Sequence, residues 1–274
     1  MTLDELAFEG HTCVRLEGAR SVVIVSVSAG PRILGLFGDG ENLLAVLPEA
    51  GLDRPDGRRF RFLGGHRLWV APEDPDVTYQ PDEHPCAVSE VDGGVRVEAP
   101  PDGSGLIKSI EVRGNEHGWI VDHSLTNASS ASLRLAPWAI TQLRPGGEVT
   151  IPNDAKESGP NADRSLVLWP YTDLADPRIG FAPGVVRIDA RSGGAPLKLG
   201  VAPSLGSVRY SLMGQTFEKR MTIEPEAEYP ERGAAVQVYL CDTFCELETL
   251  GPLRIVEPDA AATHRERWAL SDSA

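Results

Sequence analysis

The residues of this sequence that are best suited to chemistry lie in residues 64–73, which read GGHRLWVAPE. This segment brings together an imidazole, a guanidinium, an indole and a carboxylate, in His66, Arg67, Trp69 and Glu73. The pKa of an imidazole lies near neutrality, so His66 is suited to general acid or base catalysis. The indole of Trp69 offers an apolar platform for a sugar ring. The segment therefore indicates carbohydrate chemistry, and its two glycines permit close approach of a ligand.

A second acidic segment, CELE, begins at Cys245 near the C-terminus. Alternate side chains of a strand point to the same face, so Glu246 and Glu248 share one face. Cys245 and Leu247 then take the opposite, buried face. A carboxylate on a rigid strand can act as the base that pairs with an acid such as His66. The pattern does not rank the two glutamates, and it also permits both to be solvated on an outer face.

The segments that must position these residues have the sequence pattern of short strands. Apolar and polar residues alternate with a period of two, glycine- and proline-rich turns separate the runs, and helical periodicity is rare. The clearest predicted strands are residues 21–25, 94–98, 107–113, 119–125, 186–189, 197–201 and 236–240. This pattern predicts an all-β protein, an antiparallel sandwich of large sheets with helix far below the average third of residues.

The size and charge of the chain limit the number of domains and the kinds of partner that we expect. Of its 274 residues, 41% are apolar and 24% are charged, as in ordinary globular proteins. No repeat or low-complexity linker divides the sequence, so we expect a single domain over residues 1–274. The formal net charge of −14 repels phosphate backbones. We therefore expect no nucleic-acid partner.

The sequence shows no sign of a membrane or secretory route. The first residues, MTLDEL, are acidic and carry no basic segment followed by an apolar stretch. The longest apolar run, from Val22 to Val27, has only the length of a strand. We expect a soluble, cytoplasmic protein without a membrane partner, either a monomer or a homodimer. Its four cysteines are too few for a disulfide scaffold in a chain of this length, so we expect free thiols.

Motifs for the commonest cofactors are absent from the sequence. It contains no nucleophile elbow, phosphate-binding loop or dinucleotide fingerprint, so we expect no cofactor. Glu73, Asp82 and His84 lie close together in the sequence, but their spacing matches no specific metal motif. We therefore predict no metal site.

Several blocks, taken in order, resemble the galactose mutarotase-like superfamily and, within it, an aldose-epimerase-like branch. They are GPRIL (30–34), GGHRLW with PE (64–73), LTN (125–127), APWAIT (136–141), PGG (145–147), LKLG (197–200), FEK (217–219), ELETLGP (246–252) and H-x-E-x-W (264–268). The resemblance spans about residues 20–270. It implies a β-supersandwich whose concave face holds a sugar.

The same resemblance implies a mechanism. In mutarotases, a C-terminal glutamate takes the proton of the anomeric hydroxyl while a histidine protonates the ring oxygen. The ring opens, the C1–C2 bond rotates, and closure gives the other anomer. Glu246 resembles that base by position, and His66 would be the acid. The sequence departs from the pattern where mutarotases carry a catalytic histidine in a central strand, because Trp138 and its neighbours occupy that region.

The remaining candidates are residues able to stack on a sugar or to bind its hydroxyl groups. They are Arg32, Arg67, Trp69, Glu73, Trp138, Lys198, Lys219 and Glu248. Arg67 alternates with His66, so one of the two can point away from the site. Roles outside a binding site are the alternative for these residues. Tryptophans often lie in the core, lysines are usually solvated, and a histidine can be hydrogen-bonded under a loop.

We expect a small-molecule carbohydrate as partner and an isomerase of the aldose 1-epimerase type, with Glu246 as base and His66 as acid. A non-catalytic carbohydrate-binding protein is the first alternative, and the missing central histidine favours it. A lyase is the second alternative. In that reaction a base removes the proton next to a uronate carboxylate, and Arg67 or Lys219 neutralises the enolate.

Overall fold

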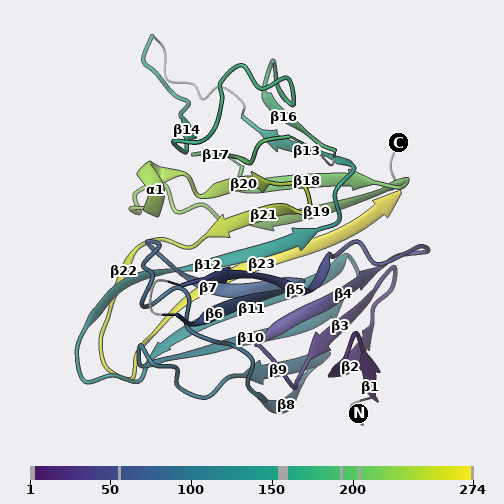
Figure 1. Ribbon diagram of the computed structural model, residues 1–274, viewed down its shortest axis with the longest axis vertical. Helices are drawn as coiled ribbons and strands as arrows, with labels where there is room; N and C mark the ends of the chain where they lie inside the picture. Colours follow the sequence, from purple (N-terminus) through teal and green to yellow (C-terminus); the bar gives the residue numbers. More distant parts are fainter. Residues whose placement is uncertain (1–3, 55–56, 154–159, 192–193, 203–204, 273–274) are drawn as a thin grey trace.

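The computed structural model describes residues 4–54, 57–153, 160–191, 194–202 and 205–272. In this part of the chain, 23 strands form two large antiparallel sheets and one hairpin, and the only helix is the short α1 (Figure 1). α1 (Pro230–Gly233) is a single turn in which Glu231 and Arg232 have positive φ angles of 51° and 58°. The predicted all-β class is therefore correct.

The first sheet has 11 strands and carries both chemical segments of the sequence. Its strands, in spatial order, are β1 (Asp4–Phe8), β2 (His11–Glu17), β3 (Val22–Ser26), β4 (Arg32–Phe37), β7 (His66–Ala71), β12 (Leu133–Leu143), β21 (Cys245–Leu250), β20 (Val236–Leu240), β17 (Leu197–Val201) and β14 (Leu166–Leu168), with β22 (Arg254–Val256) paired to β12. The central strands β7, β12 and β21 are consecutive neighbours. They bring residues 66–71 beside residues 245–250.

The second sheet has 10 strands and lies behind the first (Figure 1). Its strands, in spatial order, are β15 (Ile179–Ala182), β16 (Val185–Ala190), β13 (Gly147–Pro152), β18 (Ser207–Leu212), β19 (Gln215–Met221), β23 (Ala261–Asp272), β11 (Gly118–Asn127), β10 (Leu106–Asn115), β9 (Gly94–Glu98) and β8 (Ala87–Val91). Every strand predicted from the alternation of apolar residues lies in one of the two sheets, apart from differences of one or two residues at its ends.

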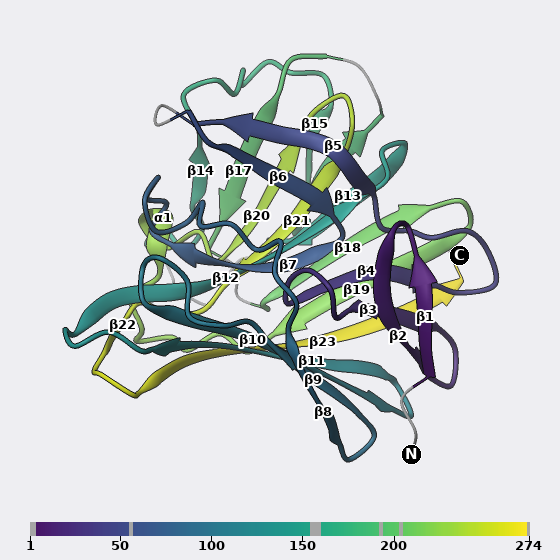
Figure 2. The ribbon, with the colours of Figure 1, turned by 60° about the horizontal axis from the view of Figure 1, so that its bottom comes forward.

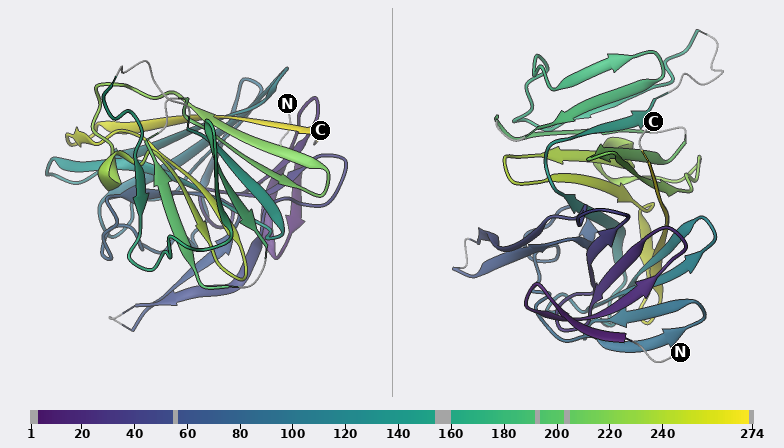
Figure 3. Two further views of the ribbon diagram at one scale, coloured as in Figure 1. Left: turned by 90° about the horizontal axis from the view of Figure 1, so that it is seen from above. Right: turned by 90° about the vertical axis from the view of Figure 1, so that its right-hand side faces the viewer.

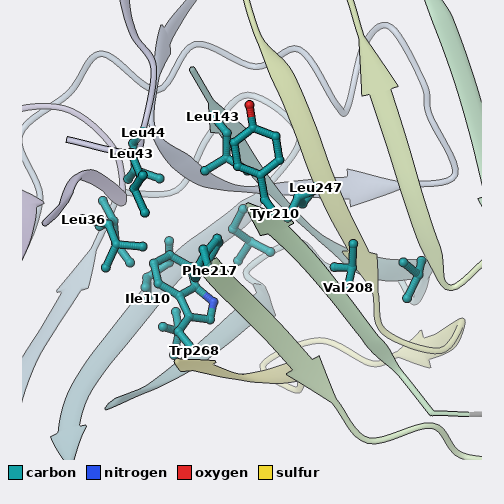
Figure 4. Close-up of a cluster of buried hydrophobic side chains, with 14 of the residues drawn as sticks. Leu36, Leu43, Leu44, Ile110, Leu143, Val208, Tyr210, Phe217, Leu247 and Trp268 are labelled. Carbon is teal, nitrogen blue, oxygen red and sulfur yellow. The ribbon is translucent and has the colours of Figure 1, made fainter. Parts of the chain in front are cut away.

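The hydrophobic core fills the space between the two sheets. Figure 4 shows side chains of both sheets meeting there, with Leu143 and Leu247 from the first sheet near Phe217 and Tyr210 from the second. All four are fully buried. Burial of such apolar surface is the main stabilising contribution to a fold of this kind.

Strand alternation gives the three central strands of the first sheet two different faces. In β21, Cys245 and Leu247 belong to the core, as predicted. Glu246 and Glu248 point to the other side, away from the second sheet. The same alternation sets Leu68 of β7 in the core. The outward face of these strands is therefore free to bind a ligand, while the inward face packs the sandwich.

The hairpin of β5 (Val46–Asp53) and β6 (Arg59–Gly64) stands on that outward face (Figures 2 and 3). Its Phe60 packs edge-on against Trp69, with ring centroids 5.5 Å apart. The turn from β6 into β7 needs two glycines, since Gly64 and Gly65 have φ angles of 84° and 72°. A Cβ on Gly65 would lie 2.1 Å from the carbonyl oxygen of Ile33. The glycine pair therefore permits the tight turn into β7.

No helix among the described residues has the length and apolar character needed to cross a lipid bilayer.

Candidate functional site

A pocket of about 270 Å³ opens on the outward face of the first sheet. It is lined by aromatic, cationic and acidic side chains from six strands and the neighbouring loops: Phe62, Arg67, Trp69, Glu73, Tyr79, Trp138, Trp169, Tyr171, Lys198, Tyr239, Phe244 and Glu246. Small-molecule sites commonly measure about 300–1,000 Å³. The size therefore suits a single small ligand better than a long polymer.

Glu246 is held in this pocket by two neighbours that donate hydrogen bonds. Arg67 Nη2 lies 3.3 Å from Glu246 Oε1, and Gln142 Nε2 lies 2.9 Å from the same oxygen. Arg67 Nη1 also donates to Gln142 Oε1 at 3.2 Å. Gln142 is fully buried, so this three-residue network fixes the orientation of the carboxylate.

The environment of Glu246 suits proton transfer near neutral pH. Burial raises the pKa of its carboxyl to about 7, and the nearby Glu248 acts in the same direction. Arg67, Lys198 and the hydrogen bond from Gln142 lower the pKa but do not offset burial. A carboxyl with a pKa close to the ambient pH can both accept and return a proton.

A second carboxylate, Glu248, lies beneath the pocket and holds Lys198. Glu248 is fully buried, and its Oε2 accepts from Lys198 Nζ at 2.9 Å and from Trp138 Nε1 at 2.7 Å. The ammonium also lies 4.7 Å from the ring centroids of both Trp138 and Trp169. A carboxylate and two indole faces therefore confine Lys198.

The aromatic wall leaves one polar atom without a protein partner. Trp69 is 6% exposed, and its Nε1 makes no hydrogen bond among the described residues. The indole packs edge-on against Trp138 at 5.4 Å, and the Arg67 guanidinium lies 4.0 Å from its ring centroid. A buried donor without a partner is costly, and a ligand oxygen would satisfy it.

The structure brings together most of the residues predicted from the sequence. Arg67, Trp69, Glu73, Trp138, Lys198 and Glu246 line the pocket, and Glu248 contacts two of them. Gln142 and six aromatic lining residues were not predicted. Those aromatic residues are Phe62, Tyr79, Trp169, Tyr171, Tyr239 and Phe244. The period-two pattern of residues 236–240 places Tyr239 on a strand, but no local signal marks the others as pocket residues.

His66 lies on the opposite side of β7 from this pocket, so the prediction that it is the acid partner of Glu246 is wrong. Its side chain is fully buried between the sheets. There His66 Nε2 lies 2.7 Å from His123 Nε2, and His66 Nδ1 lies 2.9 Å from Thr141 Oγ1. Strand alternation turns Arg67 outward and its neighbour His66 inward.

The imidazoles of the interior form a chain of neutral groups. Burial lowers the pKa of His66 well below its usual value and also lowers that of His123. His123 Nδ1 lies 2.9 Å from the carbonyl oxygen of His264, so this nitrogen must carry the proton and donate. His123 Nε2 then accepts from His66, and His66 Nδ1 accepts from the Thr141 hydroxyl. All of these donors and acceptors are satisfied within the protein.

The other predicted lysine, Lys219, belongs to this interior and cannot touch a ligand in the pocket. It is fully buried, and its Nζ lies 2.8 Å from Glu266 Oε1. Trp268 Nε1 donates to Glu266 Oε2 at 2.7 Å, and the Thr249 hydroxyl donates to Oε1. We name this group of His66, His123, Thr141, Lys219, Thr249, His264, Glu266 and Trp268 the interior polar cluster.

His66, His123 and Glu266 offer three atoms that lie within 4.8 Å of one another, a spacing that a metal ion could bridge. However, the Lys219 ammonium already balances the charge of Glu266. An added dication would lie close to this buried ammonium, where repulsion is weakly screened. The interior polar cluster is therefore better suited to joining the two sheets than to holding a metal.

Arg32 also lies outside the pocket. It is fully buried, donates to the carbonyl oxygens of Phe62 and Gly64 at 2.9 and 2.6 Å, and forms an ion pair with Asp82 at 2.5 Å. The prediction that Arg32 binds the substrate is therefore wrong. Its role is structural, because these bonds fix the turn that leads into β7.

A second hollow, of about 280 Å³, is lined by prolines and by residues that include Asp82, His84, Asp102 and Lys108. Its charged groups are paired, since Asp82 binds Arg32 and Lys108 lies 3.1 Å from Asp102. Asp82 and His84 lie here and Glu73 in the pocket of Glu246, so these three residues do not gather around one ion. The pocket of Glu246 remains the better candidate site.

Comparisons with solved structures identify the fold of the protein. The chain has the galactose mutarotase-like fold, a two-sheet all-β sandwich. One similar structure is a galactose mutarotase-like protein from Lactobacillus casei ATCC 334, with a TM-score of 0.60 and 9% identity over 94% of this chain and 100% of that one. Another is a galactose mutarotase-like protein from Clostridium acetobutylicum, with a TM-score of 0.52 and 10% identity over 99% and 98% of the two chains.

The Slr1438 protein from Synechocystis sp. PCC 6803 is also similar, with a TM-score of 0.59 and 11% identity over 100% of this chain and 98% of that one. In sequence, no protein-family model matches the chain. A comparison with curated proteins likewise finds no match. At these identities the likeness concerns the fold, so the chemistry must be argued from the site itself.

Proposed function

We propose that this protein binds a monosaccharide in the pocket of Glu246 and accelerates the interconversion of its anomers, with Glu246 as the general base. One observation carries the proposal: a carboxyl with a pKa of about 7 lies on the wall of a small pocket with aromatic walls. Aromatic faces suit the apolar faces of a sugar ring, and the unpartnered Trp69 Nε1 offers a donor to a hydroxyl oxygen.

In this reaction Glu246 takes the proton of the anomeric hydroxyl while the bond between C1 and the ring oxygen breaks, and the ring oxygen takes that electron pair and a proton from a donor in the pocket. Arg67 and Gln142 hold the carboxylate so that the accepting oxygen stays in place. Rotation about C1–C2 and ring closure then give the other anomer, and Glu246 returns its proton. Each turnover leaves the protein unchanged, so the step needs only proton transfers.

The test is the rate of anomeric exchange, measured by magnetisation-transfer proton NMR on glucose, galactose, hexose phosphates and uronic acids. The spontaneous rate in the same buffer is the control. We expect acceleration that rises with pH through about 7, since the base must be ionised. Glu246→Gln should lose this acceleration by about 100-fold or more while remaining folded. Full activity in Glu246→Gln would refute the assignment of the base.

A non-catalytic sugar-binding protein is the second candidate, favoured by one observation. No histidine is among the described residues that line the pocket, so the usual acid of a mutarotase has no counterpart there. This candidate predicts saturable sugar binding with no change in anomeric exchange. The same NMR experiment, combined with calorimetric titration, separates the two candidates.

A further inference from the structure

Opening a sugar ring requires a proton donor for the ring oxygen as well as a base for the anomeric hydroxyl. His66 cannot supply that proton, because it lies between the sheets. The donor must come from a different residue of the pocket that holds Glu246. The need for such a donor rests on the proposed function.

Strand register places Lys198 across the pocket from Glu246. Lys198 pairs with Tyr239 between β17 and β20, and Tyr239 pairs with Glu246 between β20 and β21. The three residues form one row on the outward face, and the backbones of its ends are about 10 Å apart at the usual spacing of strands. Both end residues line the pocket. The Lys198 ammonium reaches over to Glu248, which lies two residues from Glu246 on the same face of β21, so the carboxylate of Glu246 and the ammonium serve one pocket.

The surroundings of Lys198 fix its ammonium at one position. Glu248 Oε2 binds Nζ at 2.9 Å, and the indoles of Trp138 and Trp169 flank it at 4.7 Å. Trp138 Nε1 donates to the same oxygen of Glu248 and so anchors the carboxylate. An acid oriented by a buried partner is the arrangement that positioned proton transfer needs.

The other donors of the pocket are engaged elsewhere or are made weaker acids by burial. Arg67 binds the base itself, and Tyr79 donates its hydroxyl to Glu73. Burial raises the pKa of Tyr171 and of Tyr239, which makes both phenols poorer acids. Lys198 is therefore the donor that the geometry favours.

We propose that Lys198 is the catalytic acid of this site and that Glu248 is its positioning residue. As Glu246 takes the proton of the anomeric hydroxyl, C1 and O1 form a carbonyl and the bond from C1 to the ring oxygen breaks. The electron pair of that bond goes to the ring oxygen, which receives a proton from the Lys198 ammonium. On closure the amine takes this proton back, and Glu246 returns its own proton to O1.

The experiment is chemical rescue of Lys198→Ala in the exchange assay. We expect kcat to fall by about 100-fold or more with KM changed only a few-fold. Methylammonium, which can donate a proton, should restore kcat in a saturable manner. Tetramethylammonium, which carries the same charge and no proton, should not. Exchange without enzyme and with Glu246→Gln corrects for catalysis by the amine itself.

Two variants complete the test. Lys198→Arg keeps the charge but donates a proton far less readily, so it should stay as slow as Lys198→Ala. Lys108→Ala removes a lysine that is also buried but pairs with Asp102 outside this pocket, and it should keep the wild-type kcat. Circular dichroism confirms that each variant is folded.

Each outcome bears on the proposal. Wild-type kcat in Lys198→Arg, or equal rescue by both amines, would overturn the acid role while leaving Glu246 as the base. A loss of kcat in Tyr239→Phe alone, with Lys198→Ala still active, would move the acid role to the phenol. If the wild-type protein accelerated exchange of no sugar, the proposed function would fall and this inference with it.

Discussion

The outward face of the central strands β7, β12 and β21 and the interior between the two sheets each hold a buried carboxylate, in different electrostatic environments. On the outward face, burial raises the pKa of Glu246 to about 7. Inside, burial acts in the same direction on Glu266, but the ammonium of Lys219 holds its pKa far below the usual range. Glu266, the more deeply buried of the two, therefore stays ionised, because an ammonium and two hydrogen-bond donors satisfy its carboxylate.

This comparison separates a structural polar group from a ligand-binding one. In the interior polar cluster, the carboxylate oxygens and the bridging imidazole nitrogens of His66 and His123 all have protein partners. In the pocket, Trp69 Nε1 and Glu248 Oε1 have none among the described residues. Between these two regions, the completeness of the partners distinguishes the pocket from the interior better than the depth of burial does.

The largest effect should come from breaking the interior ion pair. Glu266→Gln would leave the Lys219 ammonium buried without its counter-ion, so we expect a loss of about 3–5 kcal/mol in the free energy of unfolding. Urea denaturation followed by circular dichroism measures it. The control is Glu228→Gln, which removes an exposed partner of Arg134 and should change stability by less than about 0.5 kcal/mol. Equal midpoints for both variants would contradict the structural role of the cluster.

Glu246→Gln should have the opposite effect on stability. The folded pKa of Glu246 lies above its unfolded value, so the folded state binds more protons between about pH 4.5 and 7. Wild-type stability should therefore decline across that window relative to the Gln variant, by on the order of 3 kcal/mol at pH 8. Paired urea titrations at pH 4.5, 6 and 8 measure the difference. A gap that did not vary with pH would show that the carboxyl titrates normally.

The interior histidines should destabilise the protein in acid. Burial lowers the pKa of His264 to about 3, so below about pH 6.5 the unfolded state binds more protons than the folded state and stability falls. His264 alone should contribute about 2 kcal/mol of this loss at pH 5. Denaturation of Glu246→Gln between pH 7 and 5 isolates the effect from the opposing titration of Glu246. Constant stability over this range would mean that the cluster admits a proton without cost.

The smallest effects should distinguish two tryptophans on the two faces. Trp268→Phe removes a hydrogen bond to the Glu266 carboxylate and should cost about 1.5–3 kcal/mol of stability. Trp69→Phe shortens a buried ring in the same way but removes an indole N–H without a protein partner, so it should cost less stability than Trp268→Phe by about the value of that hydrogen bond. It should also weaken sugar binding by about 1 kcal/mol, or several-fold, in calorimetric titration. A reversal of the two results would contradict the roles assigned to the pocket and the interior.

Much of the fold could be predicted because short stretches of the sequence determine its strands and turns. Period-two alternation with glycine- and proline-rich turns specifies strands, and it also places Glu246 and Glu248 on one face. Alternation further shows that His66 and Arg67 face opposite sides of a strand. It does not show which side is the interior, because that depends on the second sheet. For this reason the prediction that His66 is the catalytic acid is wrong.

The composition of the pocket could be predicted only in part for a related reason. Trp169 and Tyr171 reach it from a loop, and Phe244 reaches it from the turn between β20 and β21. Their positions depend on the order of strands in the first sheet, which no short pattern encodes. Gln142 was overlooked because an amide in a strand carries no chemical signal until its neighbours, Arg67 and Glu246, are known.

The length of the glycine turn before β7 also determines which side chains of that strand face the pocket. Adding or deleting a single residue between Gly64 and His66 would exchange the two faces of the strand, sending the guanidinium of Arg67 into the sandwich and the imidazole of His66 toward the ligand. The pocket face and the packing face can otherwise vary separately, residue by residue, along the same three strands.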